Sequence, residues 1–116
     1  MAFSKKKSSG YSQRRAAKRC AMVAAAEVTD IESNTRLVAR VSEIGVGGCY
    51  VDAMNAFPVG TMVNVRISRD QGAFEAQAKI VYCDPTMGMG VAFTEVAPAQ
   101  RLTLEDWLAE IVKPAT

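Results

Sequence analysis

Apolar and polar side chains alternate along most of the chain, and this period of two is typical of strands with one buried face. The alternation is clear from Arg36, after which Leu37, Ala39 and Val41 recur at every second position. Turn signals rich in glycine, proline or aspartate separate this segment from later ones with the same period. Together they predict antiparallel strands from Arg36 to the glycine cluster that starts at Gly45, and over residues 48–53, 61–68, 73–83 and 87–95.

The segments on either side of Asp84-Pro85-Thr86 predict which side chains share a face. In each of them every second residue is apolar or aromatic. Because successive side chains of a strand point to opposite faces, these residues are expected to line the inside of one sheet. They are Phe74, Ala76, Ala78, Ile80 and Tyr82 in the first segment, and Met89, Val91 and Phe93 in the second.

The two ends of the domain are less uniform. In residues 19–30 the alanines favour a helix locally, but Ala24, Ala26 and Val28 also alternate with other residues, and we predict a strand. After Pro98 the period becomes that of an amphipathic helix that ends near Lys113-Pro114. Six strands and one terminal helix predict an all-β domain that closes into a barrel or near-barrel. The apolar stripe of the helix is Leu104, Trp107, Leu108 and Ile111, and Trp107 is expected in the core.

The composition narrows the possible chemistry. The 116 residues, 49% of them hydrophobic and 22% charged, fit one globular domain rather than a two-domain enzyme. The chain has no histidine, which excludes a Ser-His-Asp triad, a Cys-His pair and a histidine metal site. No other constellation of acid, base and nucleophile stands out, so we expect a protein that is not an enzyme.

Apolar runs and cysteines indicate the compartment. The longest apolar run, Cys20 to Ala26, has seven residues, far short of the roughly 20 that span a bilayer. Cys20, Cys49 and Cys83 are odd in number and widely spaced, which argues against a disulfide framework and a zinc site. We expect reduced, mostly buried cysteines in a cytoplasmic protein with no membrane span, metal or cofactor.

The excess of basic over acidic side chains is confined to the N-terminus. Residues 1–19 hold seven basic and no acidic side chains, whereas residues 20–116 hold seven basic and twelve acidic ones, so their formal charges are +7 and −5. Residues 1–12 are rich in serine, lysine and glycine and are expected to be a disordered tail. Three interpretations of the basic segment are open: a solvated tail, a loose contact with nucleic acid or a membrane surface, or a site for a compact anion.

Residues 13–113 resemble the PilZ domain family. The resemblance implies a bacterial, all-β, six-stranded antiparallel barrel with a C-terminal α-helix. In many members of the family this domain is a receptor for the second messenger cyclic di-GMP. The resemblance is carried by Arg14-Arg15-Ala16-Ala17-Lys18-Arg19, by the Gly-Gly turn before Cys49-Tyr50-Val51, and by Gly88-Met89-Gly90-Val91-Ala92-Phe93.

The ligand signature that the resemblance implies has two halves. The first, R-x-x-x-R before the first strand, is matched by Arg15 and Arg19, with an extra arginine at Arg14. The planar fork of an arginine can pair with a phosphate through two hydrogen bonds and can also stack on a purine. These three arginines therefore fit a ligand with two phosphates and two guanines, although a solvated basic segment is the simpler interpretation.

The second half of the signature, D/N-x-S-x-x-G between two later strands, is degenerate here. Aligned on Gly48, the chain has Glu43 where Asp or Asn is expected and Gly45 where Ser is expected. Glu43 can still accept a hydrogen bond from guanine, directly or through water, or it is a solvent-facing turn residue. Gly45 offers a backbone N–H and, with Gly47, forms a weak phosphate cradle or an ordinary turn.

Tyr82 completes the implied ligand-binding set. It lies near the end of a predicted strand, where some family members place an aromatic ring against the ligand. The alternative interpretation is ordinary packing inside the barrel.

Two functions from different classes follow. The leading hypothesis is a receptor in which cyclic di-GMP orders the basic segment against the barrel and the changed surface signals to an unidentified protein partner. The alternative is a degenerate PilZ module that binds a protein and no nucleotide. Nucleic acid is an unlikely partner, because the body is acidic and its strands lack interleaved basic and aromatic residues.

Overall fold

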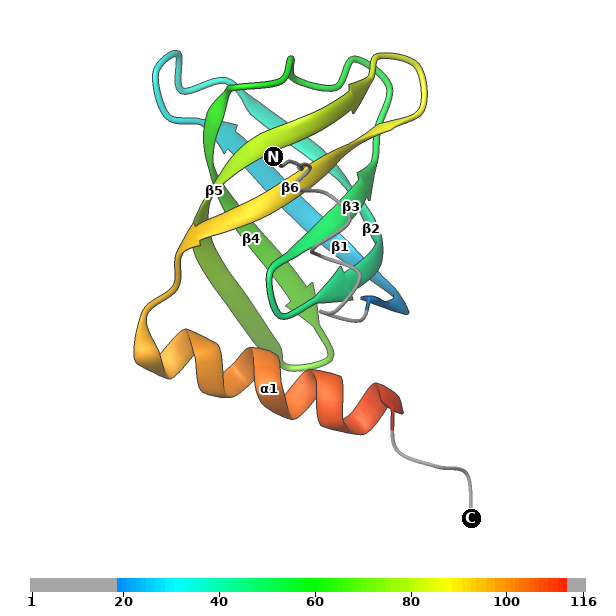
Figure 1. Ribbon diagram of the computed structural model, residues 1–116, viewed down its shortest axis with the longest axis vertical. Coiled ribbons are helices and arrows are strands. Elements are labelled where there is room, and N and C mark those ends of the chain that lie inside the picture. The colour runs from blue at the N-terminus through cyan, green and yellow to red at the C-terminus, as the bar shows by residue number, and fades with distance from the viewer. Residues whose placement is uncertain (1–18, 113–116) are drawn as a thin grey trace, which may run out of the picture.

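Six antiparallel strands close into a barrel, and one helix follows them (Figure 1). This arrangement is seen in a computed structural model that describes residues 19–112. Around the barrel the strands follow the order β1-β2-β3-β6-β5-β4. The predicted all-β barrel with a C-terminal helix is therefore confirmed. The elements are β1 (Arg19–Asp30), β2 (Arg36–Gly45), β3 (Gly48–Asp52), β4 (Met62–Arg69), β5 (Gly72–Asp84), β6 (Gly88–Glu95) and α1 (Pro98–Val112).

Strand β1 closes the barrel, because it pairs with β2 along one edge and with β4 along the other. Its Ala24, Ala26 and Val28 are buried in the core, as the alternation predicted. Alanine has the highest helix propensity, but this preference is small in energy. The backbone hydrogen bonds to two neighbouring strands outweigh it. The strand predicted for residues 19–30 is therefore confirmed.

One residue predicted to line the inside, Tyr82, lies outside. Phe74 and Ile80 of the same strand are fully buried, but Tyr82 is 51% exposed. The pairing between β5 and β6 shifts register between Ile80 and Tyr82. Such a bulge adds one residue to the strand and resets the alternation of faces beyond it. The prediction that Tyr82 shares the inner face was wrong, and so was the interpretation of its ring as barrel packing.

Helix α1 lies across one end of the barrel (Figure 1) and contacts β5 and β1. Its Leu104 and Trp107 are buried, as predicted, and the Trp107 ring lies 6.4 Å from that of Phe74. Arg69 lies over Trp107 at 5.9 Å and donates a hydrogen bond of 2.8 Å to Glu110. The helix therefore closes this end of the core. Within residues 19–112, no helix is long and apolar enough to cross a membrane.

Candidate functional site

A row of outward-facing residues crosses four neighbouring strands of the barrel. In this row Glu43 of β2 pairs with Tyr50 of β3, Tyr50 pairs with Gly90 of β6, and Gly90 pairs with Tyr82 of β5. Glu43 and Tyr82 are exposed, Tyr50 is half-buried, and Gly90 is buried. Because Gly90 has no side chain, the backbone of β6 is the low point between two tyrosines.

Arg19, the first residue of β1, places a cation close to this row. Arg19 pairs with Gly45 at the end of β2. Its guanidinium has no ion-pair partner among residues 19–112. Arg19 and the two tyrosines line one hollow of about 400 Å³, which we call the tyrosine pocket. Its lining residues are Arg19, Tyr50, Val81, Tyr82 and Gly90.

Two glycines of β6 allow the tyrosine rings to lie close to the strand. A Cβ at Gly90 would stand 3.1 Å from the Cβ of Tyr82. A Cβ at Gly88 would stand 2.8 Å from the ring of Tyr50 and 2.9 Å from its hydroxyl oxygen. The two rings are 6.3 Å apart and inclined by 39°. The shape of the tyrosine pocket therefore depends on the absence of side chains along this face of β6.

The hydroxyl of Tyr50 remains protonated at neutral pH. Burial raises the pKa of Tyr50 above 10.0, and the neighbouring Tyr82, Asp84, Asp52 and Cys83 raise it further. A phenol with such a pKa carries no charge at pH 7. The Tyr50 wall therefore adds no negative charge beside Arg19.

The predicted glycine turn is shorter than expected. Gly45 belongs to β2, so only Val46 and Gly47 connect β2 to β3. Of the described glycines only Gly60 has a positive φ, and thus Gly47 and Gly48 adopt no left-handed conformation. Gly48 serves packing instead, because a Cβ there would collide with the carbonyl oxygen of Val91.

The structure brings together part of the predicted site. Arg19 and Tyr82 line the tyrosine pocket, Gly45 pairs with Arg19, and Glu43 stands beside Tyr50. Gly47 does not line this pocket, and its carbonyl accepts a 2.9 Å hydrogen bond from the N–H of Phe93. The remaining two predicted residues, Arg14 and Arg15, lie outside the described residues.

Sequence reasoning missed three lining residues, Tyr50, Val81 and Gly90. The outward position of Tyr50 was predictable, because it alternates with Cys49 and Val51, which are fully buried. Gly90 could be noticed in the sequence, but its place between two tyrosines depends on the strand order. Val81 enters the lining at the register shift of β5.

The cysteines near the site are free thiols. All three are free, Cys49 is buried, and Cys20 and Cys83 are half-buried. Burial raises the pKa of the Cys49 thiol to about 12, although the charge of Arg19 opposes this shift. A thiol with this pKa is inert at neutral pH. Residues 19–112 contain no cluster of three or more metal-ligating side chains.

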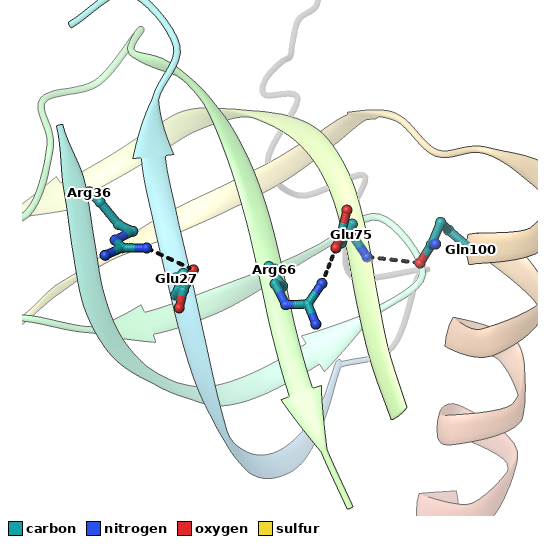
Figure 2. A network of polar contacts seen from close by, with 5 residues as sticks. All are labelled: Glu27, Arg36, Arg66, Glu75 and Gln100. Carbon is teal, nitrogen blue, oxygen red and sulfur yellow. Dashed lines mark hydrogen bonds and ion pairs between the residues drawn. The ribbon is translucent and has the colours of Figure 1, made fainter. Parts of the chain in front are cut away.

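A second and larger hollow of about 750 Å³ lies over β1, β4, β5 and the start of α1, and we call it the polar groove. Three of its charged lining residues, Glu27, Arg66 and Glu75, have polar partners nearby (Figure 2). Glu27 lies 3.7 Å from Arg36, Arg66 pairs with Glu75, and the Glu75 N–H donates to the Gln100 side chain at 2.9 Å. Its lining includes three carboxylates and one arginine, namely Glu27, Glu75, Glu95 and Arg66, so the groove disfavours an anion.

Known structures share this fold. The PilZ domain of YcgR from Escherichia coli, solved with c-di-GMP, is 19% identical with a TM-score of 0.68, and the match covers 85% of this chain and 92% of that one. MotI, an inhibitor of motility from Bacillus subtilis, is 19% identical with a TM-score of 0.68, covering 84% of this chain and 51% of MotI. The PilZ domain of CeSA from a cellulose-synthesizing bacterium is 16% identical with a TM-score of 0.62, covering 81% and 94%.

Comparisons of the sequence identify the family. No curated protein sequence matches the chain significantly. The model of the PilZ domain family matches residues 13–110, which include the three arginines of the signature, all six strands and most of the helix. Since this match extends over most of the sequence, the chain belongs to the PilZ domain family.

Proposed function

We propose that this protein is a cyclic di-GMP receptor that binds the nucleotide at the tyrosine pocket. The observation that carries the proposal is the joint presence of Arg19 and Tyr82 in one hollow. Both residues belong to the ligand-binding set that the family resemblance implies. The YcgR domain solved with c-di-GMP shares the fold and thereby supports the choice of ligand.

Arg19 supplies the chemistry that a phosphodiester requires. Its guanidinium has no anionic partner among the described residues, so binding a phosphate breaks no ion pair there. A charge-assisted hydrogen bond of this kind contributes about 1.5–3 kcal/mol. Arg14 and Arg15 precede Arg19 by five and four residues, and we propose that they complete the phosphate contacts.

Tyr82 and Glu43 offer contacts to guanine. The Tyr82 ring is 51% exposed on the rim of the pocket, where a base can stack on it. The exposed Glu43 stands two strands away from Gly90, beside Tyr50, and can accept hydrogen bonds from the N–H groups of guanine. Gly45 is the strand partner of Arg19, Gly47 lies in the following turn, and Gly48 packs against β6.

We further propose that the protein is a cytoplasmic signalling domain without catalytic activity. Ligand binding would draw the basic segment onto the barrel and create a new surface for a downstream protein partner. The +7 charge of residues 1–19 suits this step, because the ligand carries two negative phosphates.

Calorimetric titration with cyclic di-GMP at 0.15 M salt tests the proposal. Arg19→Ala and Arg15→Ala should each weaken binding at least tenfold without lowering thermal stability, because each removes a charge-assisted contact. Arg101→Ala is the matched control: it removes the same charge from an exposed position on α1. Equal binding by all four proteins would place the ligand elsewhere, and absent binding by the parent would refute the receptor.

The altered turn favours a second candidate function, a protein-interaction module without nucleotide. Gly45 cannot provide the hydroxyl of the family signature, and Glu43 carries one methylene more than Asp. The same titration distinguishes the two candidates, because the module predicts no heat of binding for the parent protein.

A further inference from the structure

We propose that Tyr50 is the second aromatic wall of the tyrosine pocket and contacts the same guanine that stacks on Tyr82. The proposal rests on the receptor function above and deepens it. Tyr50 belongs to neither half of the ligand signature, and its role comes from the register of β3, β6 and β5.

The strand register sets Tyr50 and Tyr82 on either side of Gly90. Gly90 pairs with Tyr50 on one neighbouring strand and with Tyr82 on the other, so all three residues face outward in one row. Tyr50 cannot be explained by the core, since Cys49 and Val51 beside it are fully buried and it points the opposite way. A half-buried ring on this face is therefore available to a ligand in the pocket.

Gly88 fixes where the Tyr50 ring lies. The ring covers Gly88 so closely that a Cβ there would stand 2.8 Å from it. Gly88 pairs with Asp52 on β3 and with Asp84 on β5, and the Tyr50 hydroxyl lies above it. The ring thus lies close over β6 and covers Gly88 with its edge and its hydroxyl.

The angle between the rings predicts the mode of contact. The centroids are 6.3 Å apart and the planes differ by 39°. A base inserted between two parallel rings needs about 7 Å, or two contacts of about 3.5 Å each. A guanine stacked on Tyr82 therefore meets Tyr50 at an angle and packs its edge against that ring, a geometry that aromatic pairs also favour.

Two substitutions separate the ring of Tyr50 from its hydroxyl. Tyr50→Leu keeps an apolar side chain but removes the ring, and should weaken cyclic di-GMP binding about fivefold or more. Tyr50→Phe keeps the ring and should bind within about twofold of the parent. Calorimetry of the parent, both variants and Arg19→Ala, each shown by circular dichroism to be folded, makes the comparison.

A third substitution tests the pocket without replacing either tyrosine. Gly90→Ala raises the floor by one methyl group, whose nearest neighbour is the Tyr82 Cβ at 3.1 Å. It should weaken binding at least threefold, because the base can no longer settle between the rings. Gly72→Ala is the matched control, since the new Cβ there meets no atom closer than 3.8 Å and lies in the β4–β5 hairpin.

Nuclear magnetic resonance of labelled tyrosine rings reports the contact directly. The chain has three tyrosines, and Tyr50→Phe identifies the signal of Tyr50. Saturating cyclic di-GMP should shift this signal through the ring current of the base.

The outcomes distinguish this proposal from the receptor function. Weaker binding by Tyr50→Leu and Gly90→Ala, with a shifted Tyr50 signal, supports the wall. If Arg19→Ala weakens binding but Tyr50→Leu binds like the parent and the signal does not move, the wall is refuted and the receptor stands. A parent that binds no cyclic di-GMP refutes both.

Discussion

The polar groove and the tyrosine pocket differ in whether their charged side chains have ion-pair partners. In the polar groove Arg66 pairs with Glu75 and Glu27 with Arg36, so these four side chains neutralise one another in pairs (Figure 2). In the tyrosine pocket the cation, Arg19, has no such partner within residues 19–112, and the walls are aromatic rings. By charge, the tyrosine pocket therefore suits an anion better than the larger polar groove does.

The strands that form the floor also differ between the polar groove and the tyrosine pocket. β4 and β5 carry a side chain at every outward position beneath the polar groove, including Asn64, Arg66, Glu75 and Gln77. β6 presents Gly90 in the tyrosine pocket, where the backbone itself is the floor. Depth in the pocket thus comes from missing side chains, and depth in the groove comes from the helix packed beside the sheet.

The largest expected effect comes from filling the close approach at the turn. Gly48→Ala places a methyl group against the Val91 carbonyl, where the backbone of β6 has to move. We expect the free energy of unfolding to fall by about 3 kcal/mol, at the upper end for overpacking. Urea denaturation measures the loss. Gly72→Ala should change stability far less, and equal losses would show that Gly48 is not held by β6.

Rebuilding the family signature should have the next largest effect. The double variant Glu43→Asp, Gly45→Ser shortens the carboxylate and adds a hydroxyl donor next to Arg19. Gly45 has no positive φ, so the backbone accepts Ser. We expect tighter cyclic di-GMP binding by roughly 1–3 kcal/mol, or about 5- to 150-fold.

Titration of the folded double variant beside the parent decides between the two candidate functions. Tighter binding from a measurable baseline supports the receptor. Binding that appears only in the double variant identifies the natural protein as a degenerate module. Absence of binding in both leaves the protein-interaction module.

A smaller effect is expected from the distant part of the basic segment. Deleting residues 2–12 removes three lysines, Lys5, Lys6 and Lys7, but leaves all three arginines of the signature. Because salt at 0.15 M screens charges beyond about 8 Å, the affinity should change by less than about 1 kcal/mol. A larger loss in the calorimetric titration would assign the lysines to the site.

The smallest effect is expected in the polar groove. Arg66→Ala breaks the exposed pair with Glu75 and should lower stability by less than about 1 kcal/mol. Cyclic di-GMP affinity should stay within about twofold of the parent, because the groove takes no part in binding. A tenfold loss of affinity would reverse the assignment of the two hollows.

Much of the fold could be predicted from local pattern. The alternation identified six strands, and the change of period identified α1 with Leu104 and Trp107 on its buried side. The face of Tyr82 was predicted wrongly, because a strand pattern carries no sign of the register shift after Ile80. Only the pairing of β5 with β6 shows that shift, and such pairing joins residues far apart in the sequence.

The site was less predictable than the fold for the same reason. Arg19, Glu43 and Gly45 were selected through the family signature, and their proximity follows from the register of β1 and β2. The place of Tyr50 opposite Gly90 needs the neighbour order β3-β6-β5, which skips along the chain. No periodicity within one segment reports that order.

The most direct test of the central claim is a map of backbone amide shifts on adding cyclic di-GMP. We expect the amide signals of Gly45, Gly48, Tyr50, Tyr82 and Gly90 to move and those of Glu27, Arg66 and Glu75 to stay in place. Such a result would locate the ligand in the tyrosine pocket. Shifts that cluster on Glu27, Arg66 and Glu75, with the glycine and tyrosine signals unchanged, would contradict the account.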